Sequence, residues 1–340
     1  MKRTADVSGG ALAGMNVLDL SQQLPGPYAT FLLAALGAAV TKVEPLTGDP
    51  GRHFDPEMFT AVNAGKRSLF LDLKSDAGRS RLHALIESCD VVVEGFRPGV
   101  TTRLGCDYDQ ARRIRPSIVY CSLSGMGQQG PLATHPTHDL SLQAMVGNLR
   151  GSGPTDRIGV PWVDLATGTS AALAIVAAWH ARTPAYLDMS MLDTARSWSA
   201  VKPAAVSEPE ATYGVVAAAD GAVVVALLED AMWRRLCAAL SWDDWLKDDT
   251  LATYSARRGH AARIRARLDE AFAARTLAEI IALAHEHDLP IGPTDVGDDP
   301  DVAEQLRVRN RAAGGPGAEF TPLPMPLVVP LEAAMPWPSD

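Results

Sequence analysis

Residues 15–45 read MNVLDLSQQLPGPYATFLLAALGAAVTKVEP, and this stretch predicts how the fold begins. Met15–Leu20 is a short apolar segment typical of a buried strand, and Ala38–Val43 is a second one. Between them, Tyr28–Leu36 reads as a helix that is closed by Gly37. A strand, a helix and a strand in this order form a parallel crossover.

The segment between the first strand and the helix, Ser21–Pro27, has the sequence SQQLPGP. Because Pro25, Gly26 and Pro27 follow one another, we expect a turn without regular structure there. A dinucleotide-binding fold would carry G-x-G-x-x-G at this point, and proline removes an N–H that would bind a pyrophosphate. The sequence therefore argues against NAD binding.

Strands and helices continue to alternate beyond this unit, with a loop expected at Thr47–Ala64. The alternation predicts an α/β fold with a Rossmann-like, doubly wound parallel sheet, in which ligands bind at the carboxyl ends of the strands. Further strands are expected at Ser68–Leu73, Asp90–Glu94, Ser117–Ser122 and Leu187–Met191, and helices at Asp76–Ser88 and Leu165–Ala181.

A proline- and alanine-rich run at 201–212 reads as a linker between two domains. Beyond it, Tyr213–Leu228 has an Asp-Gly turn between two valine-rich runs, which is typical of a β-hairpin. The expected parts are a disordered leader (1–14), a large CoA-binding Rossmann-like domain (15–200), the linker (201–212), a smaller α+β domain (213–305) and an extended tail returning to the large domain (306–340).

Composition narrows the function classes. The chain has 340 residues and a net charge of −9, which argues against a nucleic-acid-binding protein. The four cysteines are scattered without a CxxC pair, so they predict a reducing, cytoplasmic location and no zinc site. The first residues lack the apolar run of a signal peptide, and no apolar stretch is expected to span a membrane.

Residues 137–172 contain two groups that can transfer a proton, His138 and Asp164. His138 precedes Asp139, and Asp164 follows an apolar run at Ile158–Val163 that reads as a strand. A small-residue helix begins after Asp164, and its first N–H groups could stabilise a developing negative charge. The alternative is that Asp164 merely caps this helix.

Several segments together resemble the class III CoA-transferase (CaiB/BaiF) family, which includes the α-methylacyl-CoA racemases. The resemblance runs from Gly14 to about Arg311 and rests on many pieces in family order. These pieces include VLDLSQQLPGPYATFLLAALGAAVTKVEP, NAGKRSLFLDLKSDAGR, DVVVEGFRPGVTTRLG, IVYCSLSGMGQQGP, HDLSLQAMVG, VDLATGTSAALAI and LDMSMLDT.

The resemblance implies an acyl-CoA substrate, no tightly bound cofactor and an interlocked homodimer. It also places the CoA site at the strand ends, at Leu71, Lys74, Gly95, Phe96, Arg97 and Arg103. Lysine and arginine suit the phosphates of CoA, and leucine and phenylalanine suit its adenine. The alternative for Arg97 and Arg103 is that both are exposed residues at a helix end.

Two reactions fit the catalytic residues that the resemblance implies, Asp164, His138 and Glu229. A racemase would use Asp164 and His138 as acid and base on the two faces of an enolate, with Glu229 tuning His138. A transferase would use Asp164 as a nucleophile that forms anhydride and thioester intermediates. Because a histidine stands at 138, where transferases usually carry an aromatic residue, we expect a racemase or epimerase that acts on a 2-methylacyl-CoA-like thioester. The transferase is the alternative.

Two departures from the family motivate a third reading. Gly95 stands where the family usually has asparagine, and the turn at Arg182–Tyr186 is shortened. Both changes would suit an acyl-CoA-binding protein without catalysis. The presence of His138, Asp164 and Glu229 together favours an enzyme. An exposed acid at a helix start is the alternative for Glu229.

Overall fold

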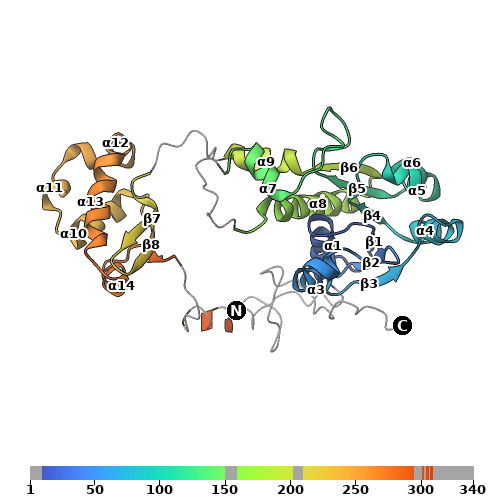
Figure 1. Ribbon diagram of the computed structural model, residues 1–340, viewed down its shortest axis with the longest axis horizontal. Coiled ribbons are helices and arrows are strands. Elements are labelled where there is room, and N and C mark those ends of the chain that lie inside the picture. The colour runs from blue at the N-terminus through green and yellow to red at the C-terminus, as the bar shows by residue number, and fades with distance from the viewer. Residues whose placement is uncertain are drawn as a thin grey trace. The chain divides into compact units, whose positions relative to one another are not determined.

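The computed structural model describes residues 10–149, 159–201 and 210–294, together with residues 301, 304, 305, 307 and 308. They belong to two compact units, one within 1–205 that also includes residues 307 and 308, and one within 206–306 (Figure 1). The predicted leader, linker and tail lie largely outside the described residues.

The larger unit is built on a six-stranded sheet with the order β3-β2-β1-β4-β5-β6, and every neighbouring pair is parallel. The order reverses between β1 and β4, which is the point where doubly wound folds bind their ligands. The strands are β1 (Asn16–Asp19), β2 (Ala39–Glu44), β3 (Arg67–Phe70), β4 (Val91–Glu94), β5 (Val119–Ser124) and β6 (Ala185–Ser190).

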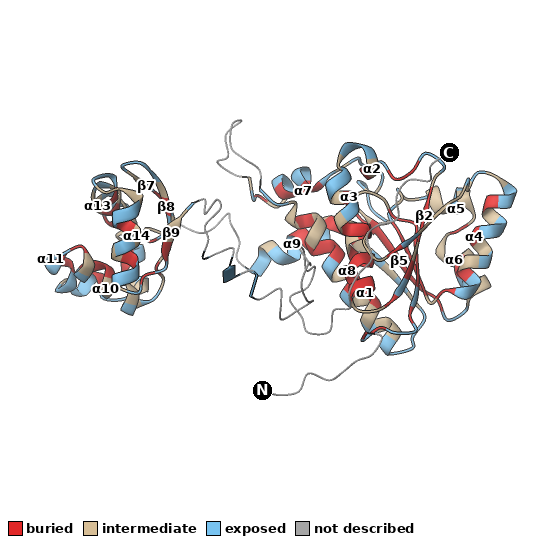
Figure 2. Cartoon of the chain, turned by 90° about the horizontal axis from the view of Figure 1, so that it is seen from below, coloured by how far each residue is buried: buried red, intermediate tan, exposed pale blue. Residues whose placement is uncertain are grey.

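Helices cover both faces of this sheet, because successive strand residues point to opposite sides. Val17 and Val91 pack on the face covered by α1 (Pro25–Ala35) and α8 (Trp162–His180). Leu18 and Val92 pack on the other face, against α4 (Asp76–Ser88) and α6 (Tyr108–Ile114). Figure 2 shows the buried strands between these two helical layers. The remaining helices of the larger unit are α2 (Gly51–Phe54), α3 (Pro56–Asn63), α5 (Val100–Leu104), α7 (Asp139–Met145) and α9 (Met191–Val201).

Helix α1 begins at Pro25, so the prediction that Pro25–Pro27 excludes regular structure was wrong. The first N–H groups of a helix have no partner inside the helix, and a proline there loses nothing. The Ser21–Leu24 segment is the true connection, and Gln23 adopts the left-handed conformation in it, with φ of 65°.

The expected loop at 47–64 contains the helices α2 and α3 instead. Asp55 starts α3 by accepting a hydrogen bond from the backbone N–H of Met58 at 2.9 Å, and Pro56 occupies the first helical position. An aspartate cap followed by proline is a helix-start signal that the prediction overlooked.

The strand expected at Ile158–Val163 is also wrong where the structure describes it, because α8 already begins at Trp162. By length and composition, α8 is the one helix among the described residues that could cross a membrane. It contacts α1, β5 and β6, as expected of a core helix of the larger unit.

The smaller unit has a three-stranded antiparallel sheet with the order β7-β8-β9. The hairpin is present as β7 (Tyr213–Ala218) and β8 (Gly221–Ala226), and β9 (Ile291–Pro293) adds a third strand beside β8. The helices are α10 (Asp230–Ala239), α11 (Asp243–Leu246), α12 (Tyr254–Arg258), α13 (Ala261–Ala273) and α14 (Leu277–Glu286).

The packing of α4 leads to a stability prediction. Ile86 is fully buried under the sheet, whereas the adjacent Glu87 is exposed. We expect Ile86→Ala to lower the free energy of unfolding by about 2–5 kcal/mol, because it leaves a cavity. Glu87→Ala should change it by less than about 0.5 kcal/mol. Urea denaturation followed by circular dichroism measures both, and equal effects would contradict the assigned packing.

Candidate active site

Two adjoining cavities open at the carboxyl ends of the strands in the larger unit. The smaller one, of about 270 Å³, lies between the loops that follow β1 and β4, at the reversal of strand order. The larger one, of about 470 Å³, is lined by residues that follow β2 and β3. Gln22 and Phe96 line both cavities. An elongated ligand could therefore occupy the two together.

Asp164 lines the smaller cavity from the first turn of α8. The helix is capped at Pro161, so the alternative that Asp164 is the capping residue was wrong. Its carboxylate makes no hydrogen bond or ion pair with any other described residue. A partly buried acid without partners is expensive to keep for structure alone, and this favours a chemical role.

Asp139 holds Asp164 in place from the first turn of α7. Its Oδ1 accepts hydrogen bonds from the backbone N–H groups of Val163 at 2.8 Å and Asp164 at 3.1 Å. Its Oδ2 accepts one from Gln143 Nε2 at 2.5 Å. Burial and the neighbouring Asp139 charge raise the pKa of Asp164 to about 7. The prediction noted Asp139 only as the neighbour of His138, although an acid at a helix start was a usable signal.

The start of α8 does not offer the free N–H donors that the sequence suggested. Asp139 binds two of them, the N–H of Trp162 donates to Val160 O at 2.8 Å, and that of Leu165 donates to Pro161 O at 3.2 Å. Among the described residues, this helix start therefore supplies no spare donor for an enolate oxygen.

His138 lines the same cavity as Asp164, so the structure brings the two predicted catalytic residues together. It is the N-cap residue of α7, and Ser141 fixes its backbone. Ser141 Oγ accepts from the His138 N–H at 3.1 Å and donates to the His138 carbonyl at 2.7 Å. His135 lines this cavity as well.

The predicted CoA-binding residues divide between the two cavities. Leu71 and Lys74 line the larger one, and Gly95 and Arg97 line the smaller one. Arg103 lines neither of these cavities; it lies exposed in the last turn of α5, as the alternative reading had it. The larger cavity also presents apolar side chains from Leu20, Val43, Pro45, Leu46, Leu73 and Leu104.

Glu94, which is not among the site residues expected from the sequence, supports Phe96 in the wall between the two cavities. Its Oε2 accepts a hydrogen bond from the Phe96 N–H at 2.7 Å, and its Oε1 accepts one from Ser122 Oγ. Burial raises the pKa of Glu94 to about 7. The signal that could have revealed it is an acid at the end of an otherwise apolar strand.

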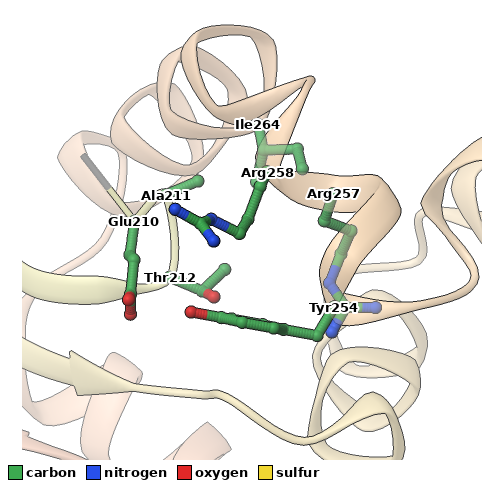
Figure 3. A pocket seen from close by; sticks show the side chains of 7 residues that line it. All are labelled: Glu210, Ala211, Thr212, Tyr254, Arg257, Arg258 and Ile264. Carbon is green, nitrogen blue, oxygen red and sulfur yellow. The ribbon is translucent and has the colours of Figure 1, made fainter. Parts of the chain in front are cut away.

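Glu229 belongs to the smaller unit, where it is the exposed N-cap residue of α10. It makes no side-chain capping hydrogen bond. A small cavity in that unit, of about 20 Å³, is lined by Tyr254, Arg257 and Arg258 among others (Figure 3). That volume holds about one water molecule, so this cavity is too small for an acyl group or CoA. The tuning role of Glu229 stays a prediction.

The described residues include no group of three or more histidine, cysteine, aspartate or glutamate side chains that could hold a metal ion. Their cysteines are buried and free. Burial raises the pKa of the Cys89 and Cys106 thiols to about 12, so neither has the character of a nucleophile.

Known proteins resemble this chain over most of its length. The model of CoA-transferase family III matches residues 12–331. Acetyl-CoA:oxalate CoA-transferase of Acetobacter aceti is 32% identical over 89% of this chain and 84% of its own length. Succinate–glutarate CoA-transferase of Agrobacterium fabrum is 31% identical over 89% of this chain and 86% of its own.

Solved structures agree with these relatives. A hypothetical protein from Mycobacterium tuberculosis has a TM-score of 0.79 and 29% identity over 87% of this chain and 88% of its own. A CaiB/BaiF family protein from Brucella suis has a TM-score of 0.74 and 29% identity over 88% of both chains. The two sheets and the family match together show that this chain belongs to the class III CoA-transferase family.

Proposed function

We propose that this enzyme is a CoA-transferase that moves CoA between carboxylic acids through intermediates on Asp164. The observation that carries the proposal is the Asp164 carboxylate, which lines the smaller cavity and has no partner among the described residues. A carboxylate nucleophile needs an oxygen lone pair that no other group occupies. The named relatives are CoA-transferases, which supports the same reaction.

The reaction consists of four acyl transfers. An Asp164 oxygen attacks the thioester carbon of the donor, which forms a mixed anhydride and releases the CoA thiolate. The thiolate attacks the Asp164 carbonyl, which gives an aspartyl–CoA thioester and frees the donor acid. The acceptor carboxylate attacks this thioester, which forms a second anhydride and releases the CoA thiolate again. The thiolate then takes the new acyl group and restores Asp164.

The two cavities suit the two ends of an acyl-CoA. We place the adenosine in the larger, apolar cavity, with Lys74 near the phosphates. The pantetheine chain would pass Gln22 and Phe96, which line both cavities. The thioester would reach Asp164, and Arg97 would favour an anionic acceptor there. CoA is then part of the substrate, and the homodimer implied by the resemblance is part of this proposal.

The racemase, which was the main expectation from the sequence, has less support than the transferase. His138 and Asp164 do line one cavity, as a two-base mechanism requires. The N–H groups at the start of α8 are already bonded, however, so they do not stabilise an enolate. Neither of the two relatives is named as a racemase.

Two substitutions separate these reactions. Asp164→Ala should reduce CoA transfer from succinyl-CoA to glutarate by at least about 10³-fold, because the nucleophile is lost. His138→Ala should keep it within about tenfold. Hydroxylamine should trap an adduct on Asp164 in the parent protein and none in Asp164→Ala. Exchange of the α-proton of 2-methylacyl-CoA in D₂O that both substitutions abolish would establish the racemase instead.

The pKa of Asp164 predicts the pH dependence. Only the ionised carboxylate attacks, so kcat/KM should fall about tenfold per pH unit below pH 7. Asp139→Asn removes a like charge and should move the midpoint to lower pH. Asp109→Asn, an exposed acid in α6, is the control. A midpoint that moves with Glu94→Gln but not with Asp139→Asn would assign the titration to Glu94.

The free energy of unfolding should also depend on the ionisation of Asp164, but it should decrease as the pH rises, whereas activity increases. The raised pKa means that folding favours protonated Asp164, so its contribution is present below pH 4 and is lost as pH rises through 7. Asp164→Asn should therefore raise the free energy of unfolding at pH 8 by about 1–3 kcal/mol while abolishing transfer. A urea titration at pH 8 measures this, and a less stable variant would contradict the stated cost of the charge.

Lys74 tests the placement of CoA. Lys74→Ala should raise KM for succinyl-CoA about tenfold, because a charge-assisted hydrogen bond of about 1.5 kcal/mol is lost, and leave kcat within about twofold. Lys74→Arg should recover much of the affinity because it keeps the charge. Arg81→Ala, an exposed cation on the neighbouring α4, is the control. An unchanged KM in Lys74→Ala would exclude this placement.

A further inference from the structure

Two lysines are buried in the larger unit, and both bind the Ser21–Pro27 segment, which lines the smaller cavity. Lys42 is fully buried on β2, and Lys66, just before β3, is 5% exposed. Burial lowers the pKa of Lys66 to about 7 even though Asp19 lies beside it. Ammonium groups are costly to remove from water unless all their hydrogens are bonded. The hydrogen bonds of the two ammonium groups therefore indicate which part of the structure the buried lysines hold in place.

Each ammonium binds an acid and a backbone carbonyl. Lys66 Nζ lies 3.1 Å from Asp19 Oδ2 and donates to Pro27 O at 2.8 Å and to Asn63 Oδ1 at 2.9 Å. Lys42 Nζ donates to Ser21 O at 2.8 Å and lies 2.9 Å from Asp49 Oδ2. The two carbonyls, those of Ser21 and Pro27, are the first and the last of the Ser21–Pro27 segment.

The same two acids also accept hydrogen bonds from backbone N–H groups of this segment. Asp49 Oδ1 accepts a hydrogen bond from the Gln23 N–H at 3.3 Å, and Asp19 Oδ1 accepts one from the Ser21 N–H at 2.9 Å. Gln23 has a φ of 65°, which a residue other than glycine keeps only where its surroundings impose it. Four residues of the segment, Gln22, Gln23, Pro25 and Gly26, line the smaller cavity.

The segment also touches the helix that carries Asp164. A Cβ added at Gly168 would lie 2.6 Å from Pro25 O, so α8 and the segment meet there without a side chain between them. Gly168 lies four residues after Asp164, which is about one helical turn. The position of the segment therefore bears on one wall of the cavity and on the helix that presents the carboxylate.

We propose that Lys66, together with Lys42, is a positioning residue that holds the Ser21–Pro27 segment against α8 and so sets the spacing between this wall of the cavity and Asp164. The inference rests on the proposed function, because the spacing matters for attack by Asp164 on an acyl group. A displacement on the order of 1 Å at a reacting centre lowers the rate about 100-fold.

The test combines kinetics with amide hydrogen exchange on the full chain. Lys66→Met removes the ammonium at similar length, and Gly168→Ala pushes the segment from the opposite side. Thr169→Ala is the control for Gly168→Ala, because it also favours helix but is exposed. With succinyl-CoA and glutarate, both variants should lower kcat about 10- to 100-fold and leave KM for succinyl-CoA within about threefold. Lys66→Met should also speed exchange of the Gln22 and Gln23 amides at least about tenfold.

Three results would overturn the proposal. One is a folded Lys66→Met variant with kcat within twofold of the parent. Another is unchanged exchange at Gln22 and Gln23 in that variant. Where Lys66→Met does not fold, a Gly168→Ala variant with the kcat of Thr169→Ala overturns it. A parent protein that transfers no CoA overturns the proposed function instead, and amide exchange alone then decides whether Lys66 holds the segment.

Discussion

The reversal of strand order between β1 and β4 is the constraint on which the site depends. Connections from these two strands must cross to opposite faces of the sheet. The chain after β1 enters α1 on one face, and the chain after β4 leads through α5 to α6 on the face that α4 also covers. Backbone cannot fill the space that their divergence leaves. The Ser21–Leu24 segment and Gly95–Arg97 therefore become walls of a cavity, and α8 brings a carboxylate to it.

Charge is treated in two different ways around this cavity. Beneath it, Asp19 and Glu44 lie beside Lys66 and Arg52, and their pKa values fall below the usual range despite burial. At its surface, Asp164 has no such cation and its pKa rises. The paired groups hold backbone geometry in place, whereas the unpaired carboxylate is the one that we propose as the nucleophile. The pKa of an aspartate here thus falls or rises according to which charged groups lie close to it.

The sequence predicted the α/β class, the parallel sheet and the hairpin because these depend on local hydrophobic periodicity. The prediction was wrong where the same residue type can either end a helix or begin one, according to its position. Pro25 was read as a breaker although it is the first residue of α1, and the apolar run before Asp164 was read as a strand although α8 begins at Trp162.

Asp164, His138, Lys74 and Phe96 could be named from the sequence because they stand in segments that resemble the family. The roles of Asp139 and Glu94 could not, since each depends on contacts across the fold. Asp139 meets the N–H groups of Val163 and Asp164, which lie 24 and 25 residues further along the chain. Only the folded chain shows that the N–H groups at the start of α8 are already bonded, and this favours the transferase over the racemase.

The shared wall of the two cavities has a consequence for how a transferase would avoid losing its products. Gln22 and Phe96 border both spaces, so a nucleotide end held in one does not have to leave when the other exchanges one acid for the next. The freed thiolate would then remain tethered within reach of Asp164, at an effective concentration far above that of CoA in solution. The thiolate would attack the next anhydride faster than CoA dissociates. The thioester bond would then pass from one acid to the other without hydrolysis.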